Sequence, residues 1–235
     1  NSNRGTALCV SDWIKQNVET LKSNGNSQIH TLYNGISLTD NLTIEEKNKN
    51  EDIEIVYVAQ IRKEKGLHVF LNICERLFLE LNQSKKIKVN IYGRGFDKNY
   101  NRLVEHMIDG LNEKYNKLVI TNQGYTNNVQ CEIKKSDLML VTSLFEDPLP
   151  TVIMEAQSMG VPVVGFCRGG IPELLNYDDD FLVKSNTEDE MVNKALNIIN
   201  SVSKDVFRKK SRKIAETYFD ININSQKFDT ILNDQ

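Results

Sequence analysis

The sequence has few of the residues that stabilise a protein through disulfides or bound metal ions. Its 235 residues include only four cysteines, and these show none of the short pair spacings of a zinc site or a disulfide framework. They are Cys9, Cys74, Cys131 and Cys167. The three histidines share no local motif. We therefore expect reduced thiols, a cytoplasmic protein and no metal site.

Long apolar runs are also missing, and neither sign of charge dominates. No stretch approaches the roughly 18 residues of a membrane span. The polar start "NSNRGT" does not resemble a signal peptide. A formal net charge of -3 and a pI of about 5.7 give no general attraction to nucleic acid. Because 40% of the residues are hydrophobic, we expect a soluble, globular protein with a proper core.

From Ile53 onward, short apolar runs alternate with segments of helical periodicity. The first helical segment repeats its apolar residues at the spacing of one helix face, at Leu67, Phe70, Cys74, Leu77, Phe78 and Leu81. Thr187 and Glu190 form a capping box that predicts a helix from Glu188. Short apolar strands with helical crossovers predict an α/β fold, a doubly wound, Rossmann-like parallel sheet. Such sheets bind ligands at the carboxyl ends of their strands.

The first 35 residues form a separate small unit in this prediction. It consists of a strand in "TALCVS", a helix over residues 12–23, a strand in "QIHTLY" and the turn Asn34-Gly35. Residues 37–52, "SLTDNLTIEEKNKNED", indicate a linker or irregular surface. Near the other end of the chain, the basic residues between Lys204 and Lys213 indicate a solvated helix face.

A basic loop follows the first predicted strand of the main sheet. The segment "QIRKEKG" places Arg62, Lys63 and Lys65 ahead of Gly66, where a helix begins. Cations beside a helix N-terminus suit a phosphate, because the free N–H groups and the helix dipole also favour an anion. The alternative is a solvated basic loop without a ligand.

Glycine-containing loops follow three other predicted strands. In "YGRG", Gly93 and Gly95 allow a ligand to approach the backbone closely. The third glycine of a dinucleotide fingerprint is absent because position 98 is Lys98, which disfavours an NAD enzyme. In "TNQGYT", Tyr125 either flanks a base or belongs to a plain turn. The paired glycines of "CRGGIPE" suit either a tight turn or a polar ligand near a helix N-terminus.

The stretch "SLFEDPLPTVIMEAQSMGVPVVGF", residues 143–166, sets carboxylates among apolar residues. Glu146 and Asp147 precede Pro150, and Glu155 lies inside a run that predicts a short buried helix, followed by a buried strand over residues 161–164. A buried charge is costly unless it is paired. Glu155 is therefore either an exposed helix position or a functional carboxylate.

Taken in order, these segments resemble the retaining glycosyltransferases of family 4, whose GT-B fold has two Rossmann-like domains. The segments are "YNGIS", "VYVAQIRKEKG", "IYGRG", "DLMLVTSLFEDPLPTVIMEAQSMGVPVV" and "GGIPELL". The resemblance implies that residues 1–35 end the acceptor-side domain and form the hinge, and that residues 36–218 are the C-terminal, nucleotide-sugar (donor) binding domain. Residues 219–235 would be the C-terminal crossover helix. The N-terminal acceptor domain would be missing from this sequence.

The most specific match is the family's acidic pair with seven residues between, here Asp147 and Glu155, with Glu146 as an alternative for the first position. The resemblance implies catalytic roles for Lys65, Asp147 and Glu155. Glu155 would accept hydrogen bonds from ribose hydroxyls, Asp147 would hold the donor sugar, and Lys65 would neutralise the diphosphate. Further donor contacts are expected at Gln60, Arg62, Gly66, Gly93, Arg94, Tyr125, Pro150, Thr151 and Val152. The family usually has arginine where this chain has Gln60, so one charge at the diphosphate is missing.

The function that the resemblance implies is transfer of a sugar, with retention of anomeric configuration and without a metal, to an unidentified acceptor. The donor would be a UDP- or GDP-sugar, with no further cofactor, and the pathway would be polysaccharide or glycoconjugate biosynthesis. Peripheral membrane association is a further expectation for the full-length protein, and nucleic acid is not an expected partner. Two alternatives remain: a non-catalytic nucleotide-sugar-binding module, which Gln60 favours, and a GT-B sugar-nucleotide epimerase.

Overall fold

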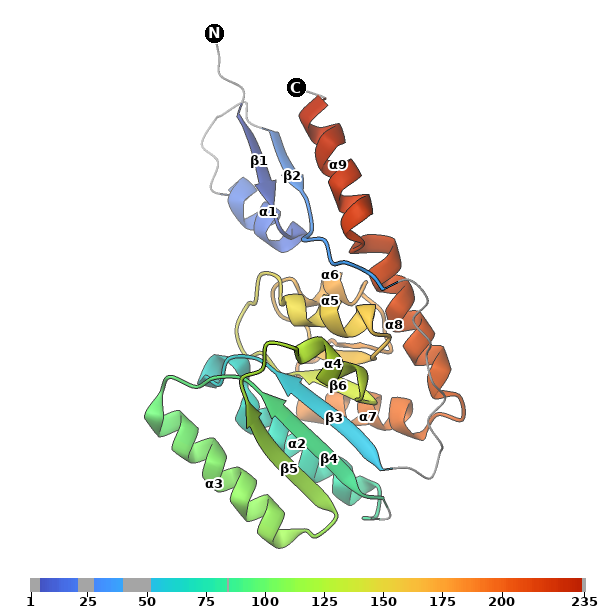
Figure 1. Ribbon diagram of the computed structural model, residues 1–235. Helices are drawn as coiled ribbons and strands as arrows, with labels where there is room; N and C mark the ends of the chain where they lie inside the picture. Colours follow the sequence, from blue (N-terminus) through green and yellow to red (C-terminus); the bar gives the residue numbers. More distant parts are fainter. Residues whose placement is uncertain (1–4, 21–27, 40–51, 84, 234–235) are drawn as a thin grey trace.

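A parallel sheet of six strands forms the centre of the structure, a computed structural model that describes residues 5–20, 28–39, 52–83 and 85–233 (Figure 1). The strands are β3 (Ile53–Val58), β4 (Ile87–Tyr92), β5 (Leu118–Gly124), β6 (Leu138–Val141), β7 (Val163–Phe166) and β8 (Leu182–Val183). Their order across the sheet is β5-β4-β3-β6-β7-β8. The predicted doubly wound α/β fold is confirmed, and its topological switch point lies between β3 and β6.

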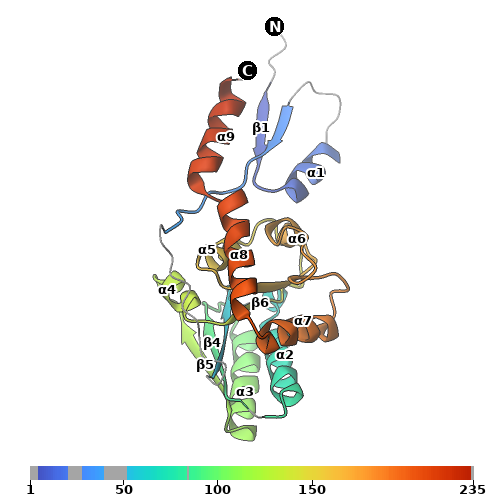
Figure 2. The same cartoon turned by 90° about the vertical axis from the view of Figure 1, so that its right-hand side faces the viewer.

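Helices cover both faces of this sheet (Figure 2). On one face lie α2 (Leu67–Glu80), α3 (Lys98–Lys114) and α7 (Glu188–Asn200), and on the other lie α4 (Val129–Lys134) and α5 (Thr151–Ser158). All four residues of β6 are buried, as expected for a parallel strand covered from both sides. The predicted start of α7 is confirmed, because Thr187 Oγ1 accepts from the Glu190 N–H at 3.3 Å.

Two elements differ from the sequence prediction. The short helix α4 falls between β5 and β6, where no helix was predicted. Strand β7 begins at Val163, two residues after the predicted start at position 161. Both differences concern elements of four to six residues, which are too short for a period to mark their ends.

The prediction of a solvated basic face on α8 (Lys204–Tyr218) is wrong for its central residues. Arg208 is buried, and its Nη1 donates to the carbonyl oxygen of Ser136 at 3.2 Å. Lys210 pairs with Asp178 at 2.7 Å and with Asp180 at 2.5 Å. The helix packs against α5 rather than standing in solvent, so these cations have partners from loops distant in the sequence.

The predicted small unit at the start of the chain is present as β1 (Thr6–Cys9), α1 (Asp12–Thr20) and β2 (Gln28–Thr31), with β1 and β2 parallel. The end of the predicted helix over residues 12–23 and most of the predicted linker lie outside the described residues. Helix α9 (Ile221–Asn233) runs beside this unit in both views (Figures 1 and 2). No helix within the described ranges is long and apolar enough to span a lipid bilayer.

The chain passes twice between the small unit and the sheet, and the two passages lie side by side. The Ile36 N–H donates to the carbonyl oxygen of Phe219 at 2.7 Å, and the Ile221 N–H donates back to that of Ile36 at 3.1 Å. These passages fall close to the predicted boundaries at residues 35–36 and 218–219. The division into domains stays a prediction.

Glu173, on α6 (Ile171–Leu174), joins the small unit to the sheet-containing body. Its carboxylate accepts from the backbone N–H of Asp12 at 2.7 Å, from that of Trp13 at 2.8 Å and from the Tyr33 hydroxyl at 2.7 Å. Ser11 Oγ takes the next N–H of α1 at 3.2 Å, so the free donors of this helix start are satisfied. Burial, with the neighbouring Glu173 and Asp12 carboxylates, raises the pKa of Tyr33 and keeps its hydroxyl a donor.

Candidate active site

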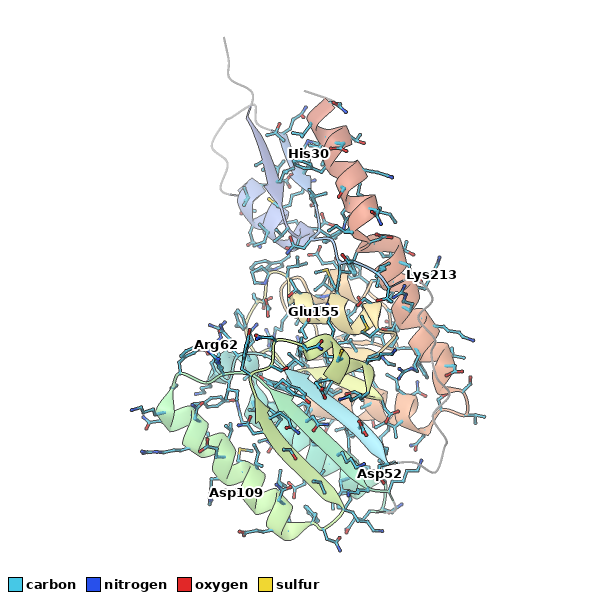
Figure 3. All side chains as sticks on the ribbon, in the orientation of Figure 1. His30, Asp52, Arg62, Asp109, Glu155 and Lys213 are labelled. Atoms are coloured by element: carbon cyan, nitrogen blue, oxygen red, sulfur yellow. The ribbon has the colours of Figure 1, made fainter. Side chains whose placement is uncertain are left out.

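A cavity of about 610 Å³ lies at the carboxyl ends of the central strands, beside the switch point between β3 and β6. The predicted site residues that line it are Gln60, Arg62, Lys65, Gly93, Arg94, Tyr125, Asp147, Pro150, Thr151, Val152 and Glu155. Figure 3 labels Arg62, on the loop that enters α2, and Glu155, on α5. The structure therefore brings together residues up to 95 positions apart in the sequence, Gln60 to Glu155, around one cavity.

The basic loop is held against the loop that follows β6. Its 3-10 turn η1 (Lys63–Lys65) ends at Gly66, which has a φ of +70°. Thr142 Oγ1 donates to the Gly66 carbonyl oxygen at 2.9 Å, and a Cβ on Gly66 would come within 2.1 Å of the Thr142 carbonyl oxygen. Gly66 is buried and is not among the residues that line the cavity, and its contact with a donor stays a prediction. Its lack of a side chain serves the close contact of the two loops.

The two adjacent carboxylates of the acidic stretch point to different partners. Asp147 is 6% exposed, lines the cavity and forms an ion pair with Lys65. Glu146 is exposed and accepts from the N–H of Gly169 and from Arg168 Nη1, the latter at 3.4 Å. The geometry therefore favours Asp147 over Glu146 as the carboxylate available to a ligand in the cavity.

Glu155 lies half-buried on the wall of the cavity, in helix α5. Burial raises the pKa of its carboxyl group, because desolvation disfavours the charged form. None of the side-chain hydrogen bonds or ion pairs among the described residues ends on this carboxylate, whereas Asp147 has Lys65 as its partner. Pro150 occupies the N-cap position of α5, and Thr151 begins the helix. A partly buried carboxylate without a protein partner is a candidate ligand-binding group.

The loops after β4 and β5 complete the cavity. The Gly93 N–H donates to the Gly124 carbonyl oxygen at 2.8 Å, and a Cβ on Gly93 would come within 1.9 Å of the Ala59 carbonyl oxygen. The Arg94 guanidinium carbon lies 4.4 Å from the centroid of the Tyr125 ring. Lining residues that the sequence analysis did not single out are Val58, Ala59, Tyr92, Phe96, Thr126, Val129 and Leu149.

The paired glycines of "CRGGIPE" form a tight turn, one of the two alternatives for this motif. The Gly170 N–H donates to the carbonyl oxygen of Asp147 at 2.8 Å. Gly169 has a φ of +54°, and a Cβ there would come within 2.2 Å of the same oxygen. The turn thus packs directly against the backbone of Asp147. It does not line the cavity.

The arrangement offers anion-binding and hydroxyl-binding groups in one place. Lys65 and Arg62 are cations on one side of the cavity, and Asp147 and Glu155 are carboxylates. No group of three or more His, Cys, Asp or Glu side chains suited to a metal ion occurs among the described residues. The four cysteines are free thiols.

Comparisons with solved structures show the same fold in other proteins. HepE (Alr3699) from Anabaena, in complex with UDP and glucose, has a TM-score of 0.76 at 19% identity, over 97% of this chain and 62% of that one. TarM from S. aureus, in a complex that includes UDP, also has a TM-score of 0.76 at 19% identity, over 96% of this chain and 43% of that one. The sheet with its helices is therefore a domain of the GT-B type.

Curated relatives match at the level of sequence. The putative colanic acid biosynthesis glycosyltransferase WcaL of Escherichia coli (strain K12) is 29% identical over 143 residues, 57% of this chain and 33% of the relative. Spore coat protein SA of Bacillus subtilis (strain 168) is 22% identical over 90% of this chain and 60% of the relative. The chain thus spans between about a third and three fifths of the length of these relatives. The profile of the glycosyl transferases group 1 matches residues 52–201, well over half of the chain, and the chain belongs to this family.

Proposed function

We propose that this chain is the donor-binding half of a retaining, metal-independent glycosyltransferase of family 4 that uses a UDP- or GDP-sugar. The observation that carries the proposal is the convergence of Lys65, Asp147 and Glu155 on one cavity at the switch point of the sheet. UDP in the complexes of HepE and TarM supports a nucleotide diphosphate as the bound group. The other predicted site residues that line this cavity are proposed on the same grounds.

Each of the three groups has a distinct proposed role. Glu155 accepts hydrogen bonds from the ribose hydroxyls, for which its unpartnered carboxylate is suited. Asp147 binds hydroxyls of the donor sugar, and Lys65, now paired with Asp147, binds the diphosphate. The N–H groups at the start of α5, around Thr151 and Val152, add donors for the sugar and phosphate.

The proposed reaction proceeds on one face of the sugar. The bond between the anomeric carbon and the phosphate oxygen breaks, and its electron pair leaves with the nucleoside diphosphate. Lys65 stabilises the charge that develops on that oxygen. The acceptor hydroxyl forms its bond to the anomeric carbon from the side that the leaving group vacates, and its proton passes to the departing phosphate oxygen. Anomeric configuration is thereby retained.

The remainder of the proposed enzyme would lie in a further N-terminal domain that binds the acceptor. Two observations support this. The chain spans only part of its relatives' length. Strands β1 and β2 form a two-stranded parallel sheet, in which Leu8 is 41% exposed, and Val10, directly after β1, is 39% exposed, whereas parallel sheets are normally covered on both faces. We place the full-length enzyme in the cytoplasm, in polysaccharide or glycoconjugate biosynthesis, with peripheral contact to the membrane.

Calorimetric titration of the 235-residue chain with a panel of nucleoside diphosphates tests the donor site. We expect binding of UDP or GDP and no transfer from the corresponding sugar nucleotide to crude cellular acceptors. Orientation of an acceptor contributes about 7–11 kcal/mol to such reactions. Restoring the N-terminal domain should restore transfer, with retention visible in the anomeric coupling of the product by NMR. Robust transfer by the isolated chain would place the acceptor site within these residues, and an inverted product would refute the proposed mechanism.

A further inference from the structure

The ring of Phe145 contacts both cations of the basic loop. The Arg62 guanidinium carbon lies 5.0 Å from the ring centroid, and Lys65 Nζ lies 4.9 Å from it. Both distances are within the range in which a ring face attracts a cation. Phe145 is half-buried, in the loop between β6 and α5, and it is absent from the site residues that the sequence predicted.

The backbone fixes where this ring lies relative to the basic loop. The Leu144 N–H, next to the ring-bearing residue, donates to the carbonyl oxygen of Glu64 at 2.8 Å. Thr142 Oγ1 donates to the carbonyl oxygen of Gly66 at 2.9 Å. Hydrogen bonds to Glu64, within the 3-10 turn, and to Gly66, which ends it, thus dock the turn on the segment that carries Phe145. The contact between ring and cations therefore follows from two joined loops and does not depend on one freely rotating side chain.

A ring is a different partner for a cation than a carboxylate is. It attracts the positive charge without neutralising it, and it takes up none of the cation's hydrogen-bond donors, so these N–H groups stay available to a phosphate. Lys65 also pairs with Asp147, whose carboxylate would turn to the donor sugar on binding. The ring contact would then remain and keep Lys65 in place. None of the ion pairs within the described ranges includes Arg62, which leaves its charge available.

We propose that Phe145 is a positioning residue that holds Arg62 and Lys65 as a pair of cations for the diphosphate. Arg62 then supplies the second positive charge that the neutral Gln60, two residues after the end of β3, does not provide. Both Gln60 and Arg62 line the cavity, so this charge is within the same hollow. The inference rests on the proposed function, because it needs a diphosphate in this cavity.

The test compares Phe145→Leu, which keeps an apolar side chain without a ring face, with Phe145→Tyr, which keeps the ring. Titration calorimetry of the 235-residue chain with UDP and with UMP reports the affinities. One cation–π contact at a partly exposed position corresponds to a factor of about two to five in an equilibrium constant. Phe145 makes two such contacts, so we expect Phe145→Leu to raise the Kd for UDP about four- to twenty-five-fold, with a smaller change for UMP. Phe145→Tyr should bind both as the wild type does.

A double-mutant cycle with Arg62→Gln separates positioning from general structural damage. If the ring acts through Arg62, this substitution should weaken UDP binding less in the Phe145→Leu background than in the wild type. Equal losses in the two backgrounds, or unchanged UDP affinity in Phe145→Leu, would overturn the inference. Should Phe145→Leu fail to fold, ring-fluorinated phenylalanines at position 145 keep the shape and weaken the negative ring face. UDP affinity must then fall with each added fluorine, and a flat series would overturn the inference.

Failure of the proposed function has a different outcome. If the wild type binds neither UDP nor any other nucleoside diphosphate, the donor site itself is refuted, and the role of Phe145 with it. If the wild type binds a nucleoside diphosphate and the ring variants bind it equally well, the donor site stands and only the positioning role is lost.

Discussion

Replacing Glu173 by glutamine tests whether one carboxylate joins the small N-terminal unit to the sheet. Three donors meet this side chain, the N–H groups of Asp12 and Trp13 and the hydroxyl of Tyr33. A hydrogen bond to a charged acceptor contributes about 1.5–3 kcal/mol. Glutamine keeps one oxygen and turns an NH₂ group toward a donor, so we expect local stability to fall by about 3 kcal/mol, the equivalent of roughly two of these bonds.

Amide hydrogen exchange is the assay, because the loss of local stability should be confined to the start of α1. At about 1.36 kcal/mol per tenfold change, the protection of the Asp12 and Trp13 amides should fall about 150-fold. Amides in the buried strand β3 should keep theirs. The matched control is Glu105→Gln, an exposed position in the middle of α3, for which no change is expected. Unchanged protection at Asp12 and Trp13 in Glu173→Gln would show that the carboxylate does not hold the unit.

The remaining predictions concern the cavity and two glycines outside it. Glu155→Ala should raise the Kd for a nucleoside diphosphate about tenfold or more, with the circular dichroism spectrum unchanged. Burial raises the pKa of Glu155 above its ordinary value of 4.5. Wild-type affinity should therefore fall as the pH falls through this raised pKa, because the protonated carboxyl group is a weaker acceptor. Asp147→Ala should weaken binding of the whole sugar nucleotide more than that of the bare nucleoside diphosphate, and selectivity of this kind in Glu146→Ala instead would reverse the assignment of the pair. Gly66 has a φ of +70° and faces a backbone oxygen, so Gly66→Ala should lower the free energy of unfolding by more than about 1–2 kcal/mol. The control is Gly110→Ala, in helix α3 with open space around it, which should raise the free energy of unfolding by about 0.5–1 kcal/mol. Urea denaturation measures both.

The main sheet could be predicted because its elements carry strong local patterns. The apolar residues of α2 recur on one face, and β6 is apolar throughout, so the local sequence of each element predicts which of its residues are buried. Helix α4 has only six residues, Val129–Lys134, too few for a period to appear. The basic residues of α8 were misread because their partners, such as Asp178 and Asp180 for Lys210, lie on a loop some thirty positions away.

The residues of the candidate site also fall into those that the sequence predicted and those that it did not. Lys65, Asp147 and Glu155 could be singled out because the segments that carry them resemble the motifs of a known family, and the structure places all three on one cavity. Glu173 and Phe145 could not. What distinguishes them is the set of groups that they touch: the helix start of another unit for Glu173, and two cations of another loop for Phe145. Contacts of this kind depend on how distant segments meet, which no local pattern encodes.

Gln60, which stands where the family usually has an arginine, shows why such contacts matter for function. A charge at position 60, two residues after β3, would be positioned by the backbone, because the Ala59 and Ile61 N–H groups on either side donate to the carbonyl oxygens of Tyr92 and Arg94. A charge moved to a loop loses that support and has about 2 kcal/mol of side-chain rotamer entropy to resist ordering. Arg62 is such a loop residue, in an extended conformation just ahead of the 3-10 turn, and the Phe145 ring is what it contacts. If Phe145 positions Arg62 for the diphosphate, the ring compensates for the charge that the neutral Gln60 lacks. Arginine in place of Gln60 should therefore make nucleoside diphosphate binding less dependent on Phe145.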